Sequence, residues 1–178
     1  PVWGENQGAG TSEDPYILPE AASAIKVDGE MEEKAWDSAL KLELPYETWP
    51  RENTPAPVKT EAYLCSSKSH LYVAFKCFEP KTKNIRAYYF ERDNTLADDM
   101  VVLFLDTFND ERRAYGFRSN ALGVQFDDIR TRTGTSLAWD AIYVTRTKYY
   151  DWGYLVEMAI PFNQLRFQKI KNADEQVW

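Results

Sequence analysis

The feature of this sequence that most constrains its fold is an uninterrupted run of six apolar residues between two acidic groups. The run, Met100–Leu105, follows two aspartates at 98–99 and ends at Asp106. A run of this length, rich in Val, Leu and Phe and bounded by turn-forming residues, is typical of a β-strand covered on both faces. After a turn at 108–110, residues 114–117 predict a returning antiparallel strand.

Further strand-like segments recur along the chain at a spacing typical of an antiparallel sandwich or barrel. The expected strands are Ile25–Val27, Leu42–Leu44, Thr60–Cys65, Leu71–Phe78, Ile85–Phe90, Met100–Asp106, Arg113–Phe117, Gly123–Phe126, Ala141–Thr147 and Gly153–Ile160. Apolar residues at helical spacing favour one short helix within residues 30–40, and Pro161 allows a helical turn after the last strand. The sequence therefore predicts an all-β protein, an antiparallel β-sandwich with one or two short helices.

The chain has 178 residues, a length that predicts one domain with its own core. Residues 1–24 are expected to form an irregular N-terminal arm, and residues 25–178 the sandwich, which is a candidate for truncation at its last strand near Trp178. No apolar run approaches the roughly 18 residues of a membrane helix, so this segment is expected to contain no membrane span.

The charge of the chain narrows the classes of partner. The formal net charge of −7 argues against nucleic acid and against an anionic membrane surface, because both require clustered Lys and Arg. Cations and neutral polar ligands suit an acidic surface better.

The two cysteines are expected to be free. If residues 60–78 form a hairpin, Cys65 and Cys77 lie roughly 20 Å apart at about 3.3 Å per residue. A disulfide requires Cα atoms within about 7 Å, so two buried thiols are the better interpretation. Two free thiols do not identify the redox compartment in which the protein works.

One turn is a candidate metal site. Asp106, Asn109 and Asp110 offer oxygen ligands of the kind that Ca²⁺ prefers. The alternative is that Asx residues simply form this turn.

The chain is rich in aromatic residues beside polar ones, a combination that can bind sugars. Aromatic rings stack on sugar rings while amide and guanidinium groups bond the hydroxyls. The alternative is that the aromatics are core or cross-strand pairs. The candidate ligand-binding residues are Tyr89, Arg92, Arg118, Asn120, Gln125 and Trp139.

The chain is not predicted to be an enzyme. Its one histidine, His70, falls in an expected hairpin turn beside Ser69, and adjacency in sequence does not make a catalytic triad. A weaker alternative is a glycan-cleaving site at Asp98 or Asp99, which would need two carboxyls at a defined separation across a sugar. Any hydrolase activity would belong to another domain of the full-length protein.

The segment Ile25–Trp36, which reads IKVDGEMEEKAW, resembles the opening of family 9 carbohydrate-binding modules. Residues 71–75, 99–106 and 153–162 follow in the family's order. The resemblance implies a β-sandwich of jelly-roll type and a non-catalytic, carbohydrate-binding module of a larger protein.

Residues 120–127, NALGVQFD, are similar to a motif of N-terminal modules in large bacterial envelope proteins with an uncharacterised C-terminal domain. That resemblance implies a periplasmic, outer-membrane-associated or secreted location.

The chain departs from the sugar-binding members of the family at two positions. Where they carry a stacking Trp and a Glu, this chain has Leu96 and Val102, and a second stacking Trp is absent or represented by Trp178. Strand parity places Met100, Val102 and Phe104 on one face, which is apolar. The alternative function is therefore a packing or scaffold module that docks this face on its C-terminal domain or on a partner protein.

Overall fold

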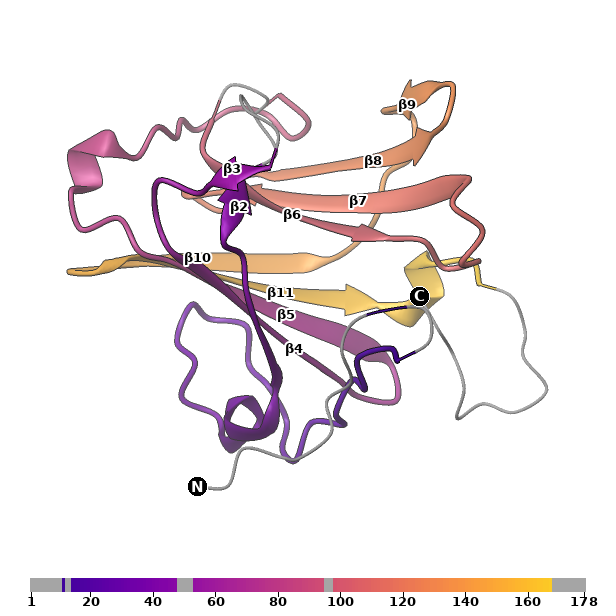
Figure 1. The fold of residues 1–178 in the computed structure, drawn as a ribbon, viewed down its shortest axis with the longest axis horizontal. Helices are drawn as coiled ribbons and strands as arrows, with labels where there is room; N and C mark the ends of the chain where they lie inside the picture. The colour runs from indigo at the N-terminus through magenta and orange to yellow at the C-terminus, as the bar shows by residue number, and fades with distance from the viewer. Residues whose placement is uncertain (1–10, 12–13, 48–52, 95–97, 168–178) are drawn as a thin grey trace.

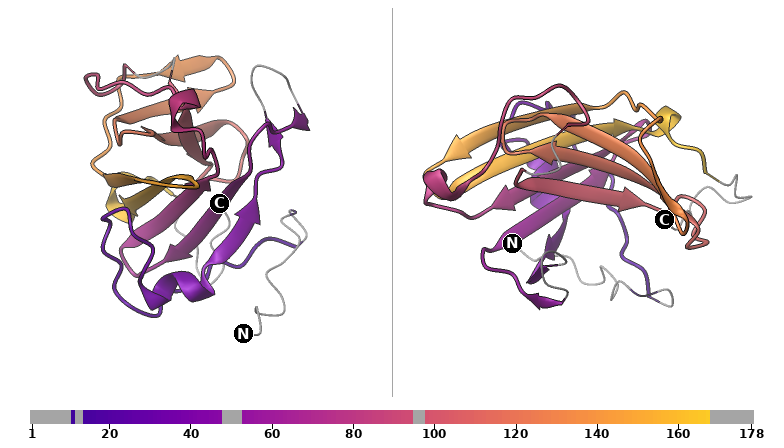
Figure 2. Two further views of the ribbon diagram at one scale, coloured as in Figure 1. Left: turned by 90° about the vertical axis from the view of Figure 1, so that its left-hand side faces the viewer. Right: turned by 90° about the horizontal axis from the view of Figure 1, so that it is seen from above.

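The structure is a computed structural model that describes residues 11, 14–47, 53–94 and 98–167. Two antiparallel sheets face each other as the two layers of a sandwich (Figures 1 and 2). One sheet has the order β1 (Leu40–Glu43), β4 (Thr60–Ser66), β5 (His70–Cys77), β11 (Gly153–Pro161) and β10 (Val144–Tyr150). The other has the order β6 (Met100–Leu105), β7 (Arg113–Asn120), β8 (Gln125–Thr131) and β9 (Gly134–Ser136). The all-β, antiparallel sandwich is thus confirmed.

The helical part of the described chain is limited to three short 3₁₀ helices. They are η1 (Lys34–Ser38), η2 (Thr82–Asn84) and η3 (Phe162–Gln164). Two of them lie where the sequence predicted a short helix or a helical turn. No helix among the described residues is long and apolar enough to cross a membrane.

The main core lies between the two sheets and follows the two-residue period of the strands. Phe117 of β7 and Val73, Val156 and Met158 of the five-stranded sheet are fully buried there. A second cluster lies on the outer side of the five-stranded sheet, where Trp36 of η1 packs with Leu155, Tyr63 and Cys65. Strand β11 is thus covered on both faces. The sequence had predicted this two-sided burial for the apolar run of β6.

Both cysteines are free and buried, as predicted. Burial raises the pKa of each thiol to about 11, so both are protonated at neutral pH.

Strand β6 is not covered on both faces, so that prediction was wrong. Val101 and Leu105 point toward the other sheet and are buried, whereas the ring of Phe104 on the opposite face is 41% exposed. The reason is position: β6 is an edge strand, and its outer side chains are only partly covered.

Two expected strands, Ile25–Val27 and Ile85–Phe90, are not strands in the structure. In each segment an amide is bonded to a carboxylate instead of to a neighbouring strand. The N–H of Lys26 donates to Glu33 Oε1 at 3.0 Å, and the N–H of Arg86 donates to Asp99 Oδ2 at 2.8 Å. Alternation of apolar residues does not show whether the amides of a segment bond to a neighbouring strand or to a carboxylate.

Three short strands were not predicted. β2 (Tyr46–Glu47) and β3 (Thr54–Pro55) pair in a two-stranded arm, and β9 has three residues. Segments this short contain no period to detect, and Pro55 and Gly134 are typical of turns. The arm crosses in front of the sandwich beside β6 (Figure 1).

One buried carboxylate fastens the N-terminal segment to the five-stranded sheet. Glu157 of β11 is fully buried and accepts the N–H groups of Asp28 at 3.0 Å and Gly29 at 2.7 Å. The Tyr150 hydroxyl donates to the Gly29 carbonyl at 2.8 Å. Gly29 has φ +88°, and a Cβ there would lie 2.9 Å from Cβ of Lys148, so the turn requires glycine.

Glu157 is expected to make stability depend on pH. Burial raises the pKa of its carboxyl from 4.5 to about 7, against the opposite effect of the two N–H donors. Between these values the folded state holds a proton that the unfolded state has lost, so the free energy of unfolding falls as the pH rises. The fall is on the order of 3 kcal/mol, and Glu157→Gln removes it, as urea unfolding from pH 4.5 to 8 will measure.

Glu61 provides the control, since its effect has the opposite sign. Burial opposes its ionisation, but Lys41 and Lys59, each 2.7 Å from Oε1, lower the pKa of Glu61 from 4.5 to about 2. Stability from Glu61 is therefore present above pH 4.5 and lost toward pH 2, so Glu61→Gln leaves the slope from pH 4.5 to 7 intact. A Glu157→Gln variant that keeps that slope would contradict the assignment.

Candidate functional site

The outer face of the four-stranded sheet brings together polar residues that are far apart in sequence. Arg118 of β7 lies between Val102 of β6 and Phe126 of β8 in the strand register. The next row holds Phe104, Gly116 and Asp128. We call Val102, Phe104, Arg118, Phe126, Asp128 and Arg130 the outer-face cluster.

An ion pair forms the centre of the outer-face cluster. The guanidinium of Arg118 is 2.6 Å from Asp128 Oδ2, and Arg130 Nε approaches the same oxygen at 3.3 Å. Arg118 is 5% exposed and Asp128 is fully buried. Burial lowers the pKa of Arg118, although Asp128 favours its charged form. Arg118 Nε is buried and has no hydrogen-bond partner in the described part of the chain.

Aromatic rings frame this ion pair. The guanidinium carbon of Arg118 lies 4.7 Å from the ring centre of Phe126 and 5.6 Å from that of Phe104. Arg130 lies 4.4 Å from the ring centre of Phe104 on the more exposed side. At the surface the cluster therefore presents the Phe104 ring and the Arg130 guanidinium, while Arg118, Phe126 and Asp128 lie buried beneath them.

Gly116 makes room for the buried carboxylate. A Cβ at this position would lie 1.9 Å from Asp128 Oδ1 and 3.0 Å from the Phe104 ring. The glycine is thus required by a close approach, and its φ angle is not the cause.

Two other candidates, Arg92 and Gln125, lie together but chiefly hold loops in place. Arg92 Nε donates to Asp127 Oδ1 at 3.0 Å, and its Nη2 donates to the Ala141 carbonyl at 2.6 Å. Gln125 Oε1 accepts from Arg92 at 3.4 Å, and Gln125 Nε2 donates to the Tyr143 carbonyl at 2.8 Å. Burial raises the pKa of Asp127 in spite of the arginine beside it. Arg92 remains on the surface, where it can also reach a ligand.

Asn120 is fully buried and saturated, so it supports the site without reaching its surface. Its Nδ2 donates to Asp98 Oδ2 at 2.8 Å and to the Tyr88 carbonyl at 3.0 Å. Its Oδ1 accepts from the amides of Leu122 and Val124. Asp98, one of the two acids considered for catalysis, accepts at Oδ2 from Asn120 and from the Tyr88 N–H, while its buried Oδ1 has no hydrogen-bond partner among the described residues.

The aromatic candidates divide between surface and core. Tyr89 is 79% exposed, next to the exposed Tyr88 and Phe90, whose ring centres are 5.9 Å apart. Trp139 instead packs on Tyr115 and Phe117, with ring centres 4.8 and 5.5 Å away. For Trp139 the structure thus favours the alternative that the aromatic residue packs in the core.

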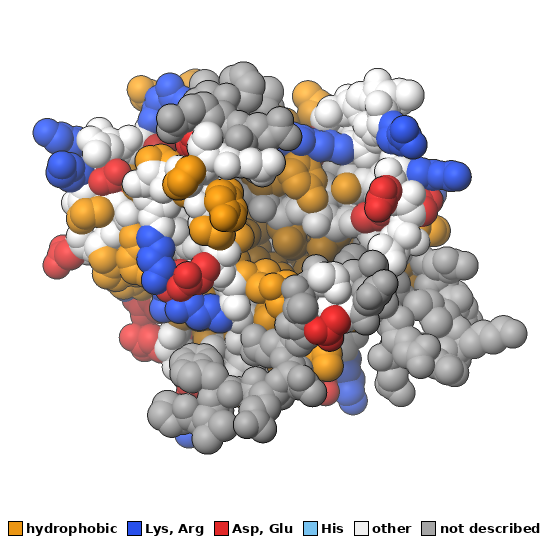
Figure 3. Space-filling model, viewed as in Figure 1, with side chains coloured by type: hydrophobic (Ala, Val, Ile, Leu, Met, Phe, Trp, Pro, Cys, Tyr) orange, Lys and Arg blue, Asp and Glu red, His pale blue; other side chains and the backbone are white. Residues whose placement is uncertain are grey.

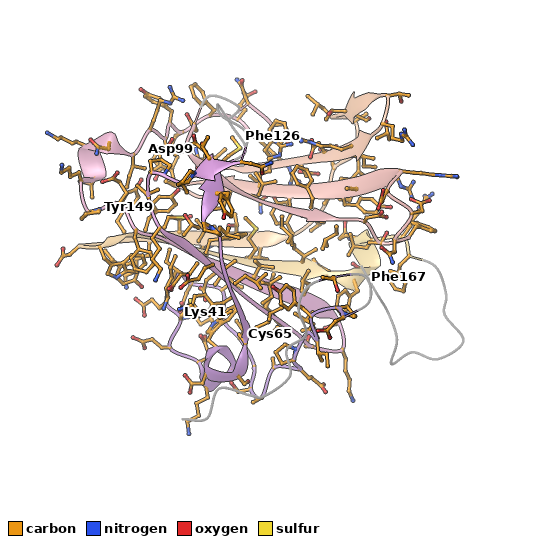
Figure 4. The ribbon with its side chains drawn as sticks, in the orientation of Figure 1. Lys41, Cys65, Asp99, Phe126, Tyr149 and Phe167 are labelled. Atoms are coloured by element: carbon orange, nitrogen blue, oxygen red, sulfur yellow. The ribbon has the colours of Figure 1, made fainter. Side chains whose placement is uncertain are left out.

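The exposed aromatics lie at one end of the sandwich. Tyr149, also exposed, lies at the same end as Asp99 (Figure 4). Burial raises the pKa of Tyr149, and the charges of Tyr89 and Asp99 add to the shift, which indicates that the three groups are neighbours. The end formed by residues 86–94 is therefore a second surface at which aromatic and polar side chains combine.

The acidic turn at 106–110 is built by its own hydrogen bonds. Asp106 accepts the amides of Phe108, Asp110 and Glu111 at 3.1, 3.0 and 2.7 Å. Asn109 has φ +50°, a conformation that Asn tolerates. Among the described residues no three His, Cys, Asp or Glu side chains form a metal-binding group. The geometry favours the turn-forming alternative over the predicted Ca²⁺ site.

His70 lies at the start of β5, with Nδ1 2.8 Å from Ser69 Oγ and its ring stacked on Tyr72. No acidic side chain in the described chain completes a triad there. Leu96 and Trp178, the positions compared with the two stacking Trp residues of the family, lie outside the described residues.

The sheet order defines an antiparallel β-sandwich whose outer face carries aromatic and polar groups. A family model described as "Carbohydrate family 9 binding domain-like" matches residues 27–176, and the chain belongs to that family. The resemblance carried by residues 25–36 is thus confirmed. Domains of this family are non-catalytic binding modules.

Solved structures of this family share the fold. A family 9 module from Caldicellulosiruptor kristjanssonii in complex with cellotriose is 19% identical with a TM-score of 0.55, and the match covers 81% of this chain and 66% of that one. The complex with glucose is 20% identical with a TM-score of 0.54, covering 86% and 71%.

A candidate carbohydrate-binding protein from Bacteroides uniformis is 15% identical with a TM-score of 0.56, covering 83% of this chain and 72% of that one. At these identities the likeness concerns the fold. This chain spans just under two thirds to nearly three quarters of the length of the three structures. No curated protein resembles the chain closely enough to count as a match.

Replacing Gly116 tests the geometry of the outer-face cluster. Gly116→Ala is expected to lower the free energy of unfolding by about 2 kcal/mol, because the methyl group displaces the buried carboxylate of Asp128. In the double variant with Asp128→Ala the clash is absent, so urea unfolding should show less than additive losses. Strict additivity would contradict the contact.

Proposed function

We propose that this domain binds a neutral glycan on the outer-face cluster. The observation that carries the proposal is the buried Arg118–Asp128 pair, set between two Phe rings on the outer side of a sheet. A buried ion pair seldom repays its desolvation as stability, so a role in recognition is favoured. The acidic net charge also suits a neutral ligand.

The chemistry of the cluster fits sugar hydroxyls. Guanidinium groups donate several hydrogen bonds in one plane, and Arg130 is exposed. Arg118 lies beneath it with a buried Nε that has no hydrogen-bond partner among the described residues. Phe104 offers an exposed ring edge, and Tyr89 with its aromatic neighbours offers stacking surface at the adjoining end of the sandwich. Membership of the family and the two sugar complexes support this ligand class.

Val102 is the position where this chain lacks a polar group that sugar-binding relatives carry. Its neighbour in the register is Arg118, so a carboxylate at 102 would lie beside the guanidinium. An apolar residue there removes one acceptor for sugar hydroxyls. We therefore expect weak binding of cello-oligosaccharides compared with members that carry the Glu.

We further propose that the domain is a non-catalytic module of a larger bacterial envelope protein. The motif at 120–127 supports this context. In the structure, Asn120 of that motif closes the β7–β8 turn through its side-chain oxygen, so the motif has a structural role as well.

Tyr89→Ala tests where the glycan binds. Calorimetric titration with cellotriose and glucose should show an increase in Kd of about fivefold, which corresponds to the loss of one stacking ring at about 1 kcal/mol. Stability should be unchanged, because the side chain is 79% exposed. Tyr46→Ala, which removes another exposed tyrosine on the β2–β3 arm, is the matched control. A loss of affinity in Tyr46→Ala and not in Tyr89→Ala would show that the sugar binds near the β2–β3 arm and would contradict the proposed site.

Val102→Glu tests the missing acceptor. The variant is expected to lower the Kd for cellotriose severalfold, since the new carboxylate lies beside Arg118 and accepts from hydroxyls. Val102→Gln, which has nearly the same size and no charge, should give a smaller gain. Equal affinities of both variants and the wild type in the same titration would argue against a site at this strand.

A further inference from the structure

Among the described edge strands of the sandwich, β6 is the one that is both uncharged and longer than three residues. The two sheets have four edges, formed by β1, β10, β6 and β9. β1 contains Lys41 and Glu43, β10 contains Arg146 and Lys148, and β9 is only three residues long. Charges and shortness are the devices that prevent an edge from pairing with another chain. β6, with the sequence MVVLFL, has neither.

The β6 edge opens on an apolar groove. β6 pairs with β7 on one side, and among the described residues no other strand pairs with it. The groove has a volume of about 560 Å³ and reaches between the two sheets to Phe75 and Tyr154, while the β2–β3 arm forms the opposite wall. In the space-filling view, hydrophobic side chains gather in a hollow near the middle of this face (Figure 3).

The charges around the groove are acidic. Asp99 and Glu79 line it, and its described lining contains no Lys or Arg. Along the strand axis, Asp99 precedes β6 and Asp106 follows it. An uncharged edge is thus bounded by a carboxylate at each end. Asp99 already accepts the Arg86 N–H and donates its own N–H to the Arg86 carbonyl, and Asp106 accepts amides of its own turn, so the unpaired edge is limited to β6 itself.

These charges disfavour a second copy of the chain as the occupant. If two β6 strands paired antiparallel over their full length, Asp99 of one would lie opposite Asp106 of the other. Like charges directly opposite each other destabilise a strand pair. A strand with a cation at each end has the complementary pattern.

We propose that β6 is a strand-addition site for an extended segment of another protein, with about six uncharged residues between two basic ones. The main chain of that segment would bond to the free edge of β6, alternate apolar side chains would enter the groove, and the basic ends would lie near Asp99 and Asp106. The site shares β6, and with it Val102 and Phe104, with the outer-face cluster, but it uses the unpaired edge of the strand and not its outer face. Peptide binding and glycan binding are therefore measured separately.

A labelled peptide, Lys-Thr-Val-Thr-Val-Thr-Val-Lys, is the probe. Fluorescence anisotropy with the whole chain should show saturable binding. Replacing the central Val with Pro, which removes an N–H donor, and replacing both Lys with Glu should each weaken binding at least tenfold. Equal binding of the Pro peptide, or no saturable binding of the Lys peptide, would overturn the proposal.

A charge reversal in the protein gives the matched test. Asp99→Lys should weaken the Lys-ended peptide about threefold to fivefold and strengthen the Glu-ended peptide. Asp37→Lys changes the net charge by the same amount. Asp37 lies exposed in η1 on the outer side of the other sheet, so this substitution should change the affinity for neither peptide. The same response from both variants would indicate a general charge effect and contradict the site.

Amide hydrogen exchange locates the added strand. With the peptide bound, alternate amides of β6 should exchange more slowly, while those of β1 and β10 should not change. Protection at β10 or β1 would move the site to another edge. Protection of β6 without peptide that increases with protein concentration would identify a second copy as the occupant and overturn the choice of partner.

Discussion

Side-chain carboxylates that accept backbone N–H groups hold the connecting segments of this protein on its two sheets. Glu157 binds the turn at 28–29, Asp98 binds the amide of Tyr88, and Asp127 binds that of Ala141 at 2.6 Å. Buried amides outside a sheet have no ladder partner, and leaving them unpaired is costly. A carboxyl group offers two acceptor oxygens, so a few acids suffice to fasten long connections. Part of the acidic excess of the chain therefore has a structural origin.

The same arrangement explains why the candidate site has so few free polar groups. Asn120, Gln125 and Arg92 are all engaged with backbone or with Asp98 and Asp127. The Arg118–Asp128 pair differs, because it binds no connecting segment and has an unpartnered donor. Its burial between Phe104 and Phe126 keeps it in one geometry. A fixed guanidinium loses little entropy when it binds, which suits recognition of a weakly held ligand.

Prediction from the sequence succeeded where a local period controls structure. Apolar runs and apolar alternation between turn residues predicted eight of the eleven strands that the structure describes, within a few residues, and the separation of the two cysteines along a hairpin identified them as free. It failed at Ile25–Val27 and Ile85–Phe90, because the alternation was present and the partner was a carboxylate. For the site it selected Arg118 as a candidate, but not Asp128, the partner in its ion pair, which lies ten residues away on the next strand.

The sequence by itself determined the class of fold and the family, since both depend on short motifs and on the period of burial along each strand. Only the tertiary structure decided which face of each strand is covered and which edge is left unpaired. The run at Met100–Leu105 shows the reason: its six apolar residues are compatible with a central strand or an edge strand. The choice depends on how many strands lie beside it, and that is a property of the sheet order and not of the run.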